Sequence, residues 1–286
     1  MIKEILIILA CVPLYIANSF CDKAVSSKYG DSYNRIYNCV KFLICTLCVF
    51  PVIFFDVSQK LALGCLLCGV ACGAMYAVSK TVILKGYERT SVAFMTICHA
   101  SGMILPCILG HFIWSEKLSL FALTGIFLAI VAIVLLKDAK GDKKRFDLKG
   151  IVFGVIIFLT SGGVMIAQKL MGIYFAGQSV VAYNLYSFAV AFLILCFFGR
   201  SQKEQRANPR GMYVCAAISA VSLSVISVVM TSLAKNVPSV ILFPLFNGLG
   251  IMLVCIGSAF VFGEKLTPKK IVGLILGVVG LCLTNF

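Results

Sequence analysis

Polar side chains within long apolar stretches are the first candidates for chemistry in this sequence. His99 and Asn247 each lie in such a stretch, 148 positions apart. An unpaired polar group is costly in apolar surroundings, so residues of this kind mark candidate sites. An imidazole could hydrogen-bond a solute or carry a proton, because histidine side chains ordinarily titrate near neutral pH. The alternative is a structural histidine that donates to a neighbouring backbone carbonyl.

Further polar or aromatic residues in apolar stretches extend the candidate set: Lys41, Tyr15, Asn18, Tyr76 and Gln168. Lys41 lies about two turns inside its stretch, where its ammonium could bind an anionic or carboxylate-bearing solute. The alternative is that Lys41 reaches back to the surface along its aliphatic stem, an interpretation that is favoured for Lys80 and Lys169. The tyrosines and amides could line a cavity, or they could anchor helices at an interface or hydrogen-bond between helices.

The elements that must position these residues are long apolar helices. The chain has 286 residues, 61% of them hydrophobic and 13% charged, and its mean hydropathy is +1.04. Soluble domains have about 25% charged residues, so this composition predicts a membrane protein. The net charge of +14 lies mainly in short connections, which argues against a nucleic-acid partner. Ten stretches are long enough to span a bilayer as helices: 2–20, 34–55, 61–84, 91–113, 118–136, 150–171, 180–198, 212–233, 238–262 and 270–283.

The sequence repeats itself with a period of 148 positions. Residues 91–136 align with residues 239–284 without a gap, so that Glu116 matches Glu264 and His99 matches Asn247. A period of about half the chain indicates two homologous halves. We predict a five-helix repeat at 1–136, a basic linker at 137–149 and a second five-helix repeat at 150–286. Because five is odd, the second half crosses the membrane in the opposite sense, as in inverted-repeat transporters whose substrate sites lie near the membrane midplane.

Positive charge orients the predicted helices. Eighteen of the 25 lysines and arginines lie in connections after odd-numbered helices, and four lie on the opposite face. Cytoplasmic connections are enriched in basic residues, so both termini are predicted to lie outside the cell. The short loops favour a bacterial cytoplasmic membrane as the location.

The sequence argues against common catalytic sites. It has no glycine-rich phosphate loop, no acidic pair with metal-ligand spacing and no nucleophile triad. The fourteen cysteines are interpreted as small apolar packing residues, and we expect no cofactor, no metal and no enzymatic activity. Glu116 and Glu264 are expected to cap the helices that follow them. No carboxylate is expected deep in a helix, so cationic drugs are disfavoured as substrates and any coupling would use His99 or a counter-solute.

Two turns carry the same five-residue motif. Ser115-Glu-Lys-Leu-Ser119 is followed by Gly125, and Gly263-Glu-Lys-Leu-Thr267 is followed by Gly273. This pattern resembles the signature of the drug/metabolite transporter superfamily, EamA type, and the resemblance covers essentially the whole chain. It implies an all-α integral membrane protein with ten transmembrane helices in two inverted five-helix repeats. It also implies cytoplasmic termini, opposite to the charge count.

The resemblance adds an expectation about the site. In EamA-type proteins the first, third, fourth, sixth, eighth and ninth helices line the cavity, which promotes Asn18, Tyr76 and Ser161 as site residues. We therefore predict a secondary transporter that moves a small polar metabolite, such as an amino acid, by alternating access. Its partners would be the solute and membrane lipid, and a homodimer could form through the terminal helices. The alternative is a flippase for a lipid or lipid-linked sugar on the same fold.

Overall fold

The computed structural model describes residues 2–29, 31–55, 63–89, 92–117, 119–136, 148–175, 177–198, 210–261 and 267–283. Regular structure in these ranges is entirely helical, which confirms the predicted all-α fold, with α4 and α5 as two parts of one predicted helix. The elements are α1 (Ile2–Tyr29), α2 (Asp31–Val49), the 3-10 helix η1 (Phe50–Phe55), α3 (Leu63–Arg89), α4 (Val92–Ser101), α5 (Ile104–Trp114), α6 (Leu120–Leu136), α7 (Leu148–Tyr174), α8 (Val180–Phe198), α9 (Arg210–Leu233), α10 (Ser239–Val261) and α11 (Pro268–Leu283).

The predicted helix 91–113 is interrupted after Ser101, so the expectation of one unbroken helix was wrong. Pro106 gives the physical reason, because proline has no N–H and its ring clashes with the carbonyl four residues earlier. That carbonyl belongs to Gly102, and it accepts a hydrogen bond from the N–H of Leu105 instead, at 3.1 Å. The N–H of Gly102 donates to the carbonyl of His99 at 3.2 Å. A tight turn therefore separates α4 from α5.

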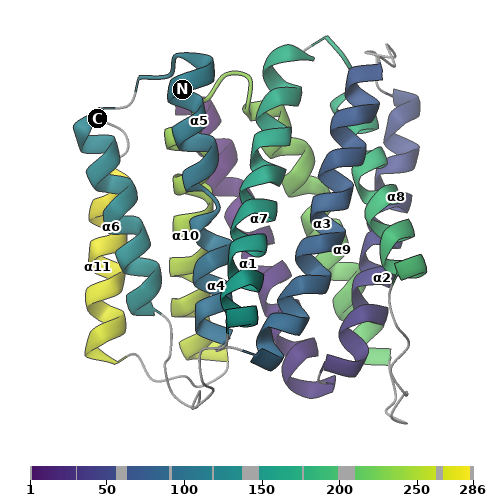
Figure 1. Ribbon diagram of the computed structural model, residues 1–286, viewed down its shortest axis with the longest axis horizontal. Helices are drawn as coiled ribbons and strands as arrows, with labels where there is room; N and C mark the ends of the chain where they lie inside the picture. Colours follow the sequence, from purple (N-terminus) through teal and green to yellow (C-terminus); the bar gives the residue numbers. More distant parts are fainter. Residues whose placement is uncertain are drawn as a thin grey trace. The chain divides into compact units, whose positions relative to one another are not determined.

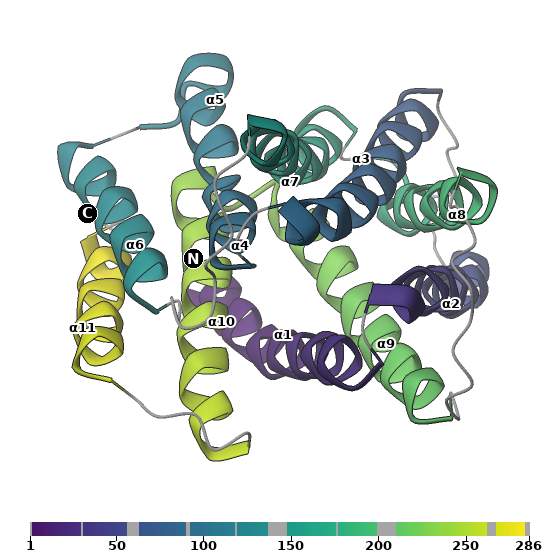
Figure 2. The ribbon, with the colours of Figure 1, turned by 60° about the horizontal axis from the view of Figure 1, so that its bottom comes forward.

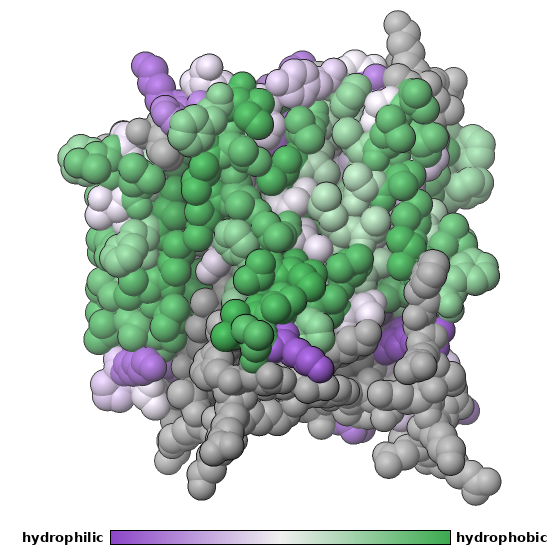
Figure 3. Space-filling model, in the orientation of Figure 1, coloured by the Kyte–Doolittle hydropathy of each residue, from purple (hydrophilic) through white to green (hydrophobic). Residues whose placement is uncertain are grey.

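Helix lengths and surface chemistry identify a multi-pass membrane protein. Among the described residues, seven helices are long and apolar enough to cross a membrane: Ile2–Val25, Arg35–Phe55, Leu63–Ile83, Leu148–Tyr174, Val180–Phe197, Arg210–Leu233 and Ser239–Gly257. Cys98–Trp114 and Leu120–Leu135 are shorter apolar helices. Large apolar side chains of α6 are exposed, including Leu120, Phe121 and Phe127, and Figure 3 shows mainly apolar side chains on the drawn face of this helix. Such a surface suits lipid rather than water.

The chain forms two compact units, and each draws residues from both sequence halves. The first unit comprises residues 1–12, 85–166 and 236–286, and the second comprises residues 13–84 and 167–235. The first therefore contains α4, α5, α6, α10 and α11, whereas the second contains α2, η1, α8 and α9. Helices α1, α3 and α7 each contribute a segment to both units.

In the first unit, glycines allow the backbones of α11 and α6 to approach each other closely. The two helices lie side by side in Figures 1 and 2. A Cβ added at Gly280 would lie 2.8 Å from the carbonyl oxygen of Gly125. Gly277 lies against Ala132 of α6 and Met252 of α10. The small-residue face of α11 is therefore occupied within the chain, while the predicted homodimer stays a prediction.

The motif turn after α5 also belongs to the first unit and differs from expectation. Glu116 was expected to cap the helix that follows it; its carboxylate accepts a hydrogen bond from the backbone N–H of Ser239 at 2.8 Å and so caps α10. The side chains of Ser119 and Thr267 cap the following helices, α6 and α11, at 3.0 and 3.4 Å. The equivalent Glu264 lies outside the described residues.

In the second unit, α2 packs between α8 and α9. Figures 1 and 2 show α2 beside α8. Phe42 and Phe188 are fully buried and form one apolar core with Cys45, Ala77 and neighbouring residues. Packing in this core fixes the rotation of α2 about its own axis. That rotation decides where the polar side chains of α2 point.

Candidate functional site

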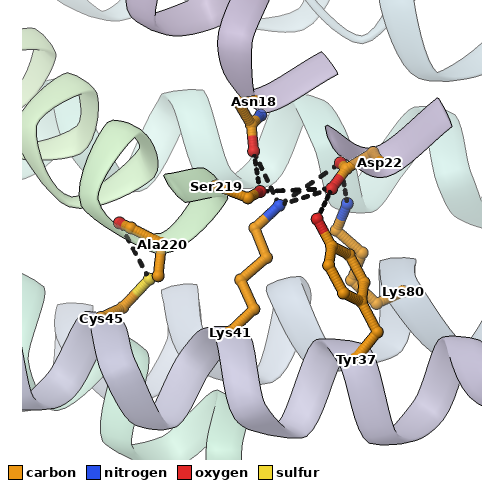
Figure 4. A network of polar contacts seen from close by, with 8 residues as sticks. All are labelled: Asn18, Asp22, Tyr37, Lys41, Cys45, Lys80, Ser219 and Ala220. Atoms are coloured by element: carbon orange, nitrogen blue, oxygen red, sulfur yellow. Dashed lines mark hydrogen bonds and ion pairs between the residues drawn. The ribbon is translucent and has the colours of Figure 1, made fainter. Parts of the chain in front are cut away.

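A cluster of polar side chains lies inside the membrane-spanning helices of the second unit (Figure 4). Its members are Asn18 and Asp22 of α1, Tyr37 and Lys41 of α2, Lys80 of α3 and Ser219 of α9. The two members on α1 are four residues apart, as are the two on α2, and this spacing places each pair on one face of its helix. Two helices therefore each present two polar groups to a common point.

Lys41 is the buried centre of the cluster, with 1% of its side chain exposed. Its Nζ donates to Asn18 Oδ1 at 2.8 Å and lies 3.0 and 3.3 Å from the two carboxylate oxygens of Asp22. The ammonium also lies 5.7 Å from the centre of the Tyr37 ring, within range of a cation–π interaction. Lys41 is thus held among polar partners inside the unit and does not extend to the surface.

Asp22 is the one carboxylate of the cluster, and its two oxygens differ. Oδ1 accepts from the Tyr37 hydroxyl at 2.5 Å, from Lys41 and from Ser219 Oγ at 3.3 Å. Oδ2 faces Lys41 and lies 3.9 Å from Lys80 Nζ. The Asp22 side chain is 33% exposed. Asp22 Oδ1 therefore has three donors, and part of the Asp22 side chain stays accessible.

Lys80 is held much less firmly than Lys41. Its side chain is 27% exposed, and its ion pair with Asp22 is long at 3.9 Å. A direct charge-assisted hydrogen bond between ammonium and carboxylate is about 2.7–2.9 Å. Within the described part of the chain, no hydrogen bond joins its ammonium to another residue. Snorkelling was the favoured interpretation for Lys80, whereas its ammonium lies beside Asp22.

Asn18 and Ser219 bridge α1 and α9. The Ser219 hydroxyl donates to Asn18 Oδ1 at 2.5 Å, the same oxygen that accepts from Lys41. Ser219 is fully buried. Asn18, a predicted site residue, therefore belongs to this polar cluster, and its role in binding stays a prediction.

The expectation that no carboxylate lies inside a helix was wrong. It placed the end of the first helix at residue 20, whereas α1 continues to Tyr29 and the apolar span includes Asp22. The sequence held a usable signal, because Asp22 follows Asn18 by one helical turn and a basic residue, Lys41, lies inside the next helix. The argument against cationic substrates, which rested on this absence, falls with it.

A second polar group of the second unit contains the predicted site residue Gln168. Its Nε2 donates to Ser227 Oγ at 3.4 Å, and the Ser227 hydroxyl donates to Asn184 Oδ1 at 2.5 Å. The Asn184 amide in turn donates to the carbonyl of Val180 at 2.8 Å. Gln168, Asn184 and Ser227 are all buried. This group links α7, α8 and α9 by hydrogen bonds.

Tyr15 and Tyr76 lie on the helices that carry the cluster. Tyr76 is half-buried on α3, with its ring centre 5.7 Å from that of Phe42 and 6.3 Å from that of Phe188. Tyr15 is half-buried on α1, three residues before Asn18. Tyr76 thus forms part of the aromatic packing on one side of α2.

His99, Asn247 and Ser161 all belong to the first unit. Asn247 is half-buried, and its Nδ2 donates to the carbonyl of Phe243 one turn earlier, at 3.0 Å. Ser161 donates to the backbone carbonyl of His99 at 2.8 Å. This bond satisfies a carbonyl at the α4–α5 interruption, where Gly102 fits closely against α7. That His99 and Asn247 bind solute together stays a prediction.

The described residues contain no group of three or more histidines, cysteines, aspartates or glutamates that could hold a metal ion. The cysteines are free thiols. Cys45 donates to the carbonyl of Ala220 at 3.4 Å and Cys65 to that of Ser179 at 3.6 Å. These thiols act as packing residues with a weak hydrogen bond.

Comparisons with known proteins agree with this architecture. The sequence matches the EamA-like transporter family over residues 1–137 and 148–286. One solved structure, described only as the crystal structure of a protein, has a TM-score of 0.76 and 12% identity, covering 98% of this chain and 96% of that chain. At this identity the likeness shows the fold alone. A comparison with curated proteins found no match. The family match spans almost the whole sequence, and the chain therefore belongs to the EamA-like transporter family, whose members are membrane transporters of the drug/metabolite transporter type.

Proposed function

We propose that the protein is a secondary transporter that moves a small polar metabolite, such as an amino acid, across the cell membrane by alternating access. The observation that carries the proposal is the cluster of Asn18, Asp22, Lys41, Lys80 and Ser219 inside membrane-spanning helices. Charged residues in membrane segments are rare, and they commonly mark the pathway of a substrate or ion.

The chemistry of the cluster favours a polar solute. Asp22 and Lys80 keep 33% and 27% of their side chains exposed, so both charges can reach a ligand. Lys41 and Ser219 are buried and position the exposed groups from behind. A zwitterionic solute would find both signs of charge here. An apolar solute would displace water from these charged side chains without replacing the hydrogen bonds that the water made.

The family also guides the remaining assignments. We place Tyr15, Tyr76, Ser161, Gln168, His99 and Asn247 among the residues that meet the solute or support those that do. Alternating access follows from the inverted five-helix repeats, because two homologous halves of opposite orientation can exchange conformations. The basic connections support termini that lie outside the cell.

Transport by purified protein tests the proposal. The protein is reconstituted in liposomes, and uptake of radiolabelled amino acids, organic acids, nucleosides and polyamines is followed against protein-free liposomes. The Ser219→Ala variant removes a hydroxyl from the cluster, and Ser232→Ala on the same helix removes an exposed hydroxyl that donates to the carbonyl of Val228, at 2.8 Å. We expect uptake of at least one solute, reduced by Ser219→Ala and unchanged by Ser232→Ala.

Two results would contradict the proposal. Uptake that never exceeds the protein-free background would remove the transport function itself. Uptake that is equal in both serine variants and in the unmodified protein would separate transport from this cluster.

A further inference from the structure

We propose that Lys80 is the binding point for an anionic group, a carboxylate or a phosphate, carried by the transported substrate. This inference rests on the proposed transport function and adds the charge of the group that the site recognises. It begins from the imbalance of charge in the cluster, where Lys41 and Lys80 face a single carboxylate, Asp22.

Lys41 and Asp22 already satisfy one another. The Lys41 ammonium has three N–H donors, and it has three acceptor oxygens within 3.3 Å on Asn18 and Asp22. Asp22 also accepts from the Tyr37 hydroxyl. The negative charge of Asp22 is therefore matched without Lys80, which leaves the second ammonium as the uncompensated charge of the cluster.

Lys80 has the properties of a ligand-binding group rather than of a structural one. Its ammonium is 3.9 Å from Asp22 Oδ2, too far for a direct hydrogen bond, and its side chain is 27% exposed. Within the described residues its three N–H donors bond to no other side chain or carbonyl. A partly exposed ion pair of this length contributes little stability, so an arriving anion can take up the donors without breaking a strong bond.

The position of the cluster along the helices supports binding within the membrane span. Asp22 lies seven residues before the end of α1 and Lys80 nine residues before the end of α3. The apolar spans Ile2–Val25 and Leu63–Ile83 end three residues beyond Asp22 and Lys80, so both charges lie about one helical turn inside their spans. Lys80 is partly shielded from water there, with 27% of its side chain exposed, so an ammonium without its own anion attracts an anionic ligand more strongly than a fully exposed lysine does.

A structural role is the competing explanation, in which the Lys80–Asp22 pair only joins α3 to α1. The stability of the ligand-free protein does not distinguish the two explanations, because a partly exposed ion pair of this length contributes little to it. They differ in ligand dependence, because a purely structural lysine would not change the affinity for any anion.

The experiment measures thermal stabilisation of the full chain in nanodiscs of phosphatidylcholine at fixed ionic strength. The probes are succinate, its neutral amide analogue succinamide and inorganic phosphate. The variants are Lys80→Met, Lys80→Arg and the control Lys235→Met, which removes an exposed lysine outside the cluster. A ligand that binds the folded state raises the midpoint of unfolding in proportion to its saturation, so the titration gives an apparent Kd.

We expect succinate or phosphate to stabilise the unmodified protein in a concentration-dependent manner, with succinamide much weaker. Lys80→Met should weaken binding of the anion by about tenfold or more, because a charge-assisted hydrogen bond is lost. Lys80→Arg and Lys235→Met should retain it. Equal effects of succinate and succinamide, equal affinity in Lys80→Met, or no anion effect in any nanodisc would overturn the inference.

A second set of nanodiscs containing phosphatidylglycerol distinguishes a solute from a lipid headgroup as the source of the anion. Stabilisation by phosphatidylglycerol that depends on Lys80, without any effect of soluble anions, would support the anion site and contradict the small-solute function. Lys80-independent uptake of a neutral solute by proteoliposomes would have the opposite meaning: transport would stand and the anion site would fall.

Discussion

Replacing Asp22 with asparagine should destabilise the protein, because it leaves the buried ammonium of Lys41 without a counter-charge. Only 1% of the Lys41 side chain is exposed, and its Nζ lies 3.0 Å from Asp22 Oδ1. Removing one partner of a buried ion pair typically costs about 3–5 kcal/mol. Asp22 is one-third exposed, and asparagine keeps an acceptor for Tyr37 and Ser219, so we expect a smaller loss of about 2 kcal/mol in the free energy of unfolding.

Replacing Lys41, the other partner of the pair, with methionine should lower the free energy of unfolding by less than Asp22→Asn does, and the geometry explains the difference. In Lys41→Met, Asp22 keeps the Tyr37 hydroxyl and can draw closer to Lys80, which already lies 3.9 Å away. We expect a loss of about 1 kcal/mol. The double variant Asp22→Asn, Lys41→Met removes both charges and should be more stable than Asp22→Asn alone, giving a coupling energy of about 1–2 kcal/mol.

The assay uses the free cysteines of the chain. Six of the fourteen are buried, and a thiol-reactive dye reports their exposure as the protein unfolds during a titration with sodium dodecyl sulfate. Lys235→Met serves as the matched control for loss of one positive charge, because Lys235 is exposed and lies outside the cluster. The reasoning is refuted if Asp22→Asn lies within about 0.5 kcal/mol of the unmodified protein, or if the double variant is less stable than Asp22→Asn.

Three further predictions concern helix packing and orientation. Gly110→Ala should lower stability by about 1 kcal/mol in the same titration, because its new methyl group would displace the Glu116 carboxylate from the start of α10. Gly280→Ala should lower the free energy of unfolding by about 1–3 kcal/mol, because the methyl group would meet the backbone of Gly125. Gly177→Ala is the control for both variants, because nothing lies within 4 Å of the added carbon. A reporter enzyme that works only outside the cytoplasm should be active when fused to the C-terminus, and activity of a cytoplasmic reporter there would reverse the assigned orientation.

The helical fold could be predicted because its causes are local in the sequence. Long apolar stretches and their basic connections locate the helices, and most predicted stretches overlap an observed helix closely. The two larger errors also have local causes. Pro106 interrupts the fourth stretch through the carbonyl of Gly102, and α1 continues past residue 20 into a less apolar segment up to Tyr29. Hydropathy alone does not detect either effect, because it averages over the residues that decide helix ends.

The candidate site could be predicted only in part because its contacts join distant segments. Asn18 and Lys41 stood out as polar residues in apolar stretches. Ser219 did not, although it hydrogen-bonds Asn18 across 201 positions, because serine is common and unremarkable in a membrane helix. Asp22 was missed through the helix boundary, and with it the partner that explains why Lys41 can be buried. The charge balance of the cluster becomes visible only when α1, α2, α3 and α9 are placed together.

The first copy of the Glu-Lys-Leu-Ser/Thr motif combines two structural roles that operate over different distances. Ser119 and Thr267 are equivalent in the repeat, and each caps the helix that follows it by a bond to a backbone N–H three residues later. Glu116 instead reaches Ser239, 123 positions away, and Gly110 leaves room for its carboxylate. The Glu116 carboxylate, which accepts this bond at 2.8 Å, also places a negative charge at the positive end of the α10 dipole, where it is stabilising. In the first copy, Ser119 therefore caps the next helix, α6, and Glu116 fixes the start of α10, the helix that carries Asn247.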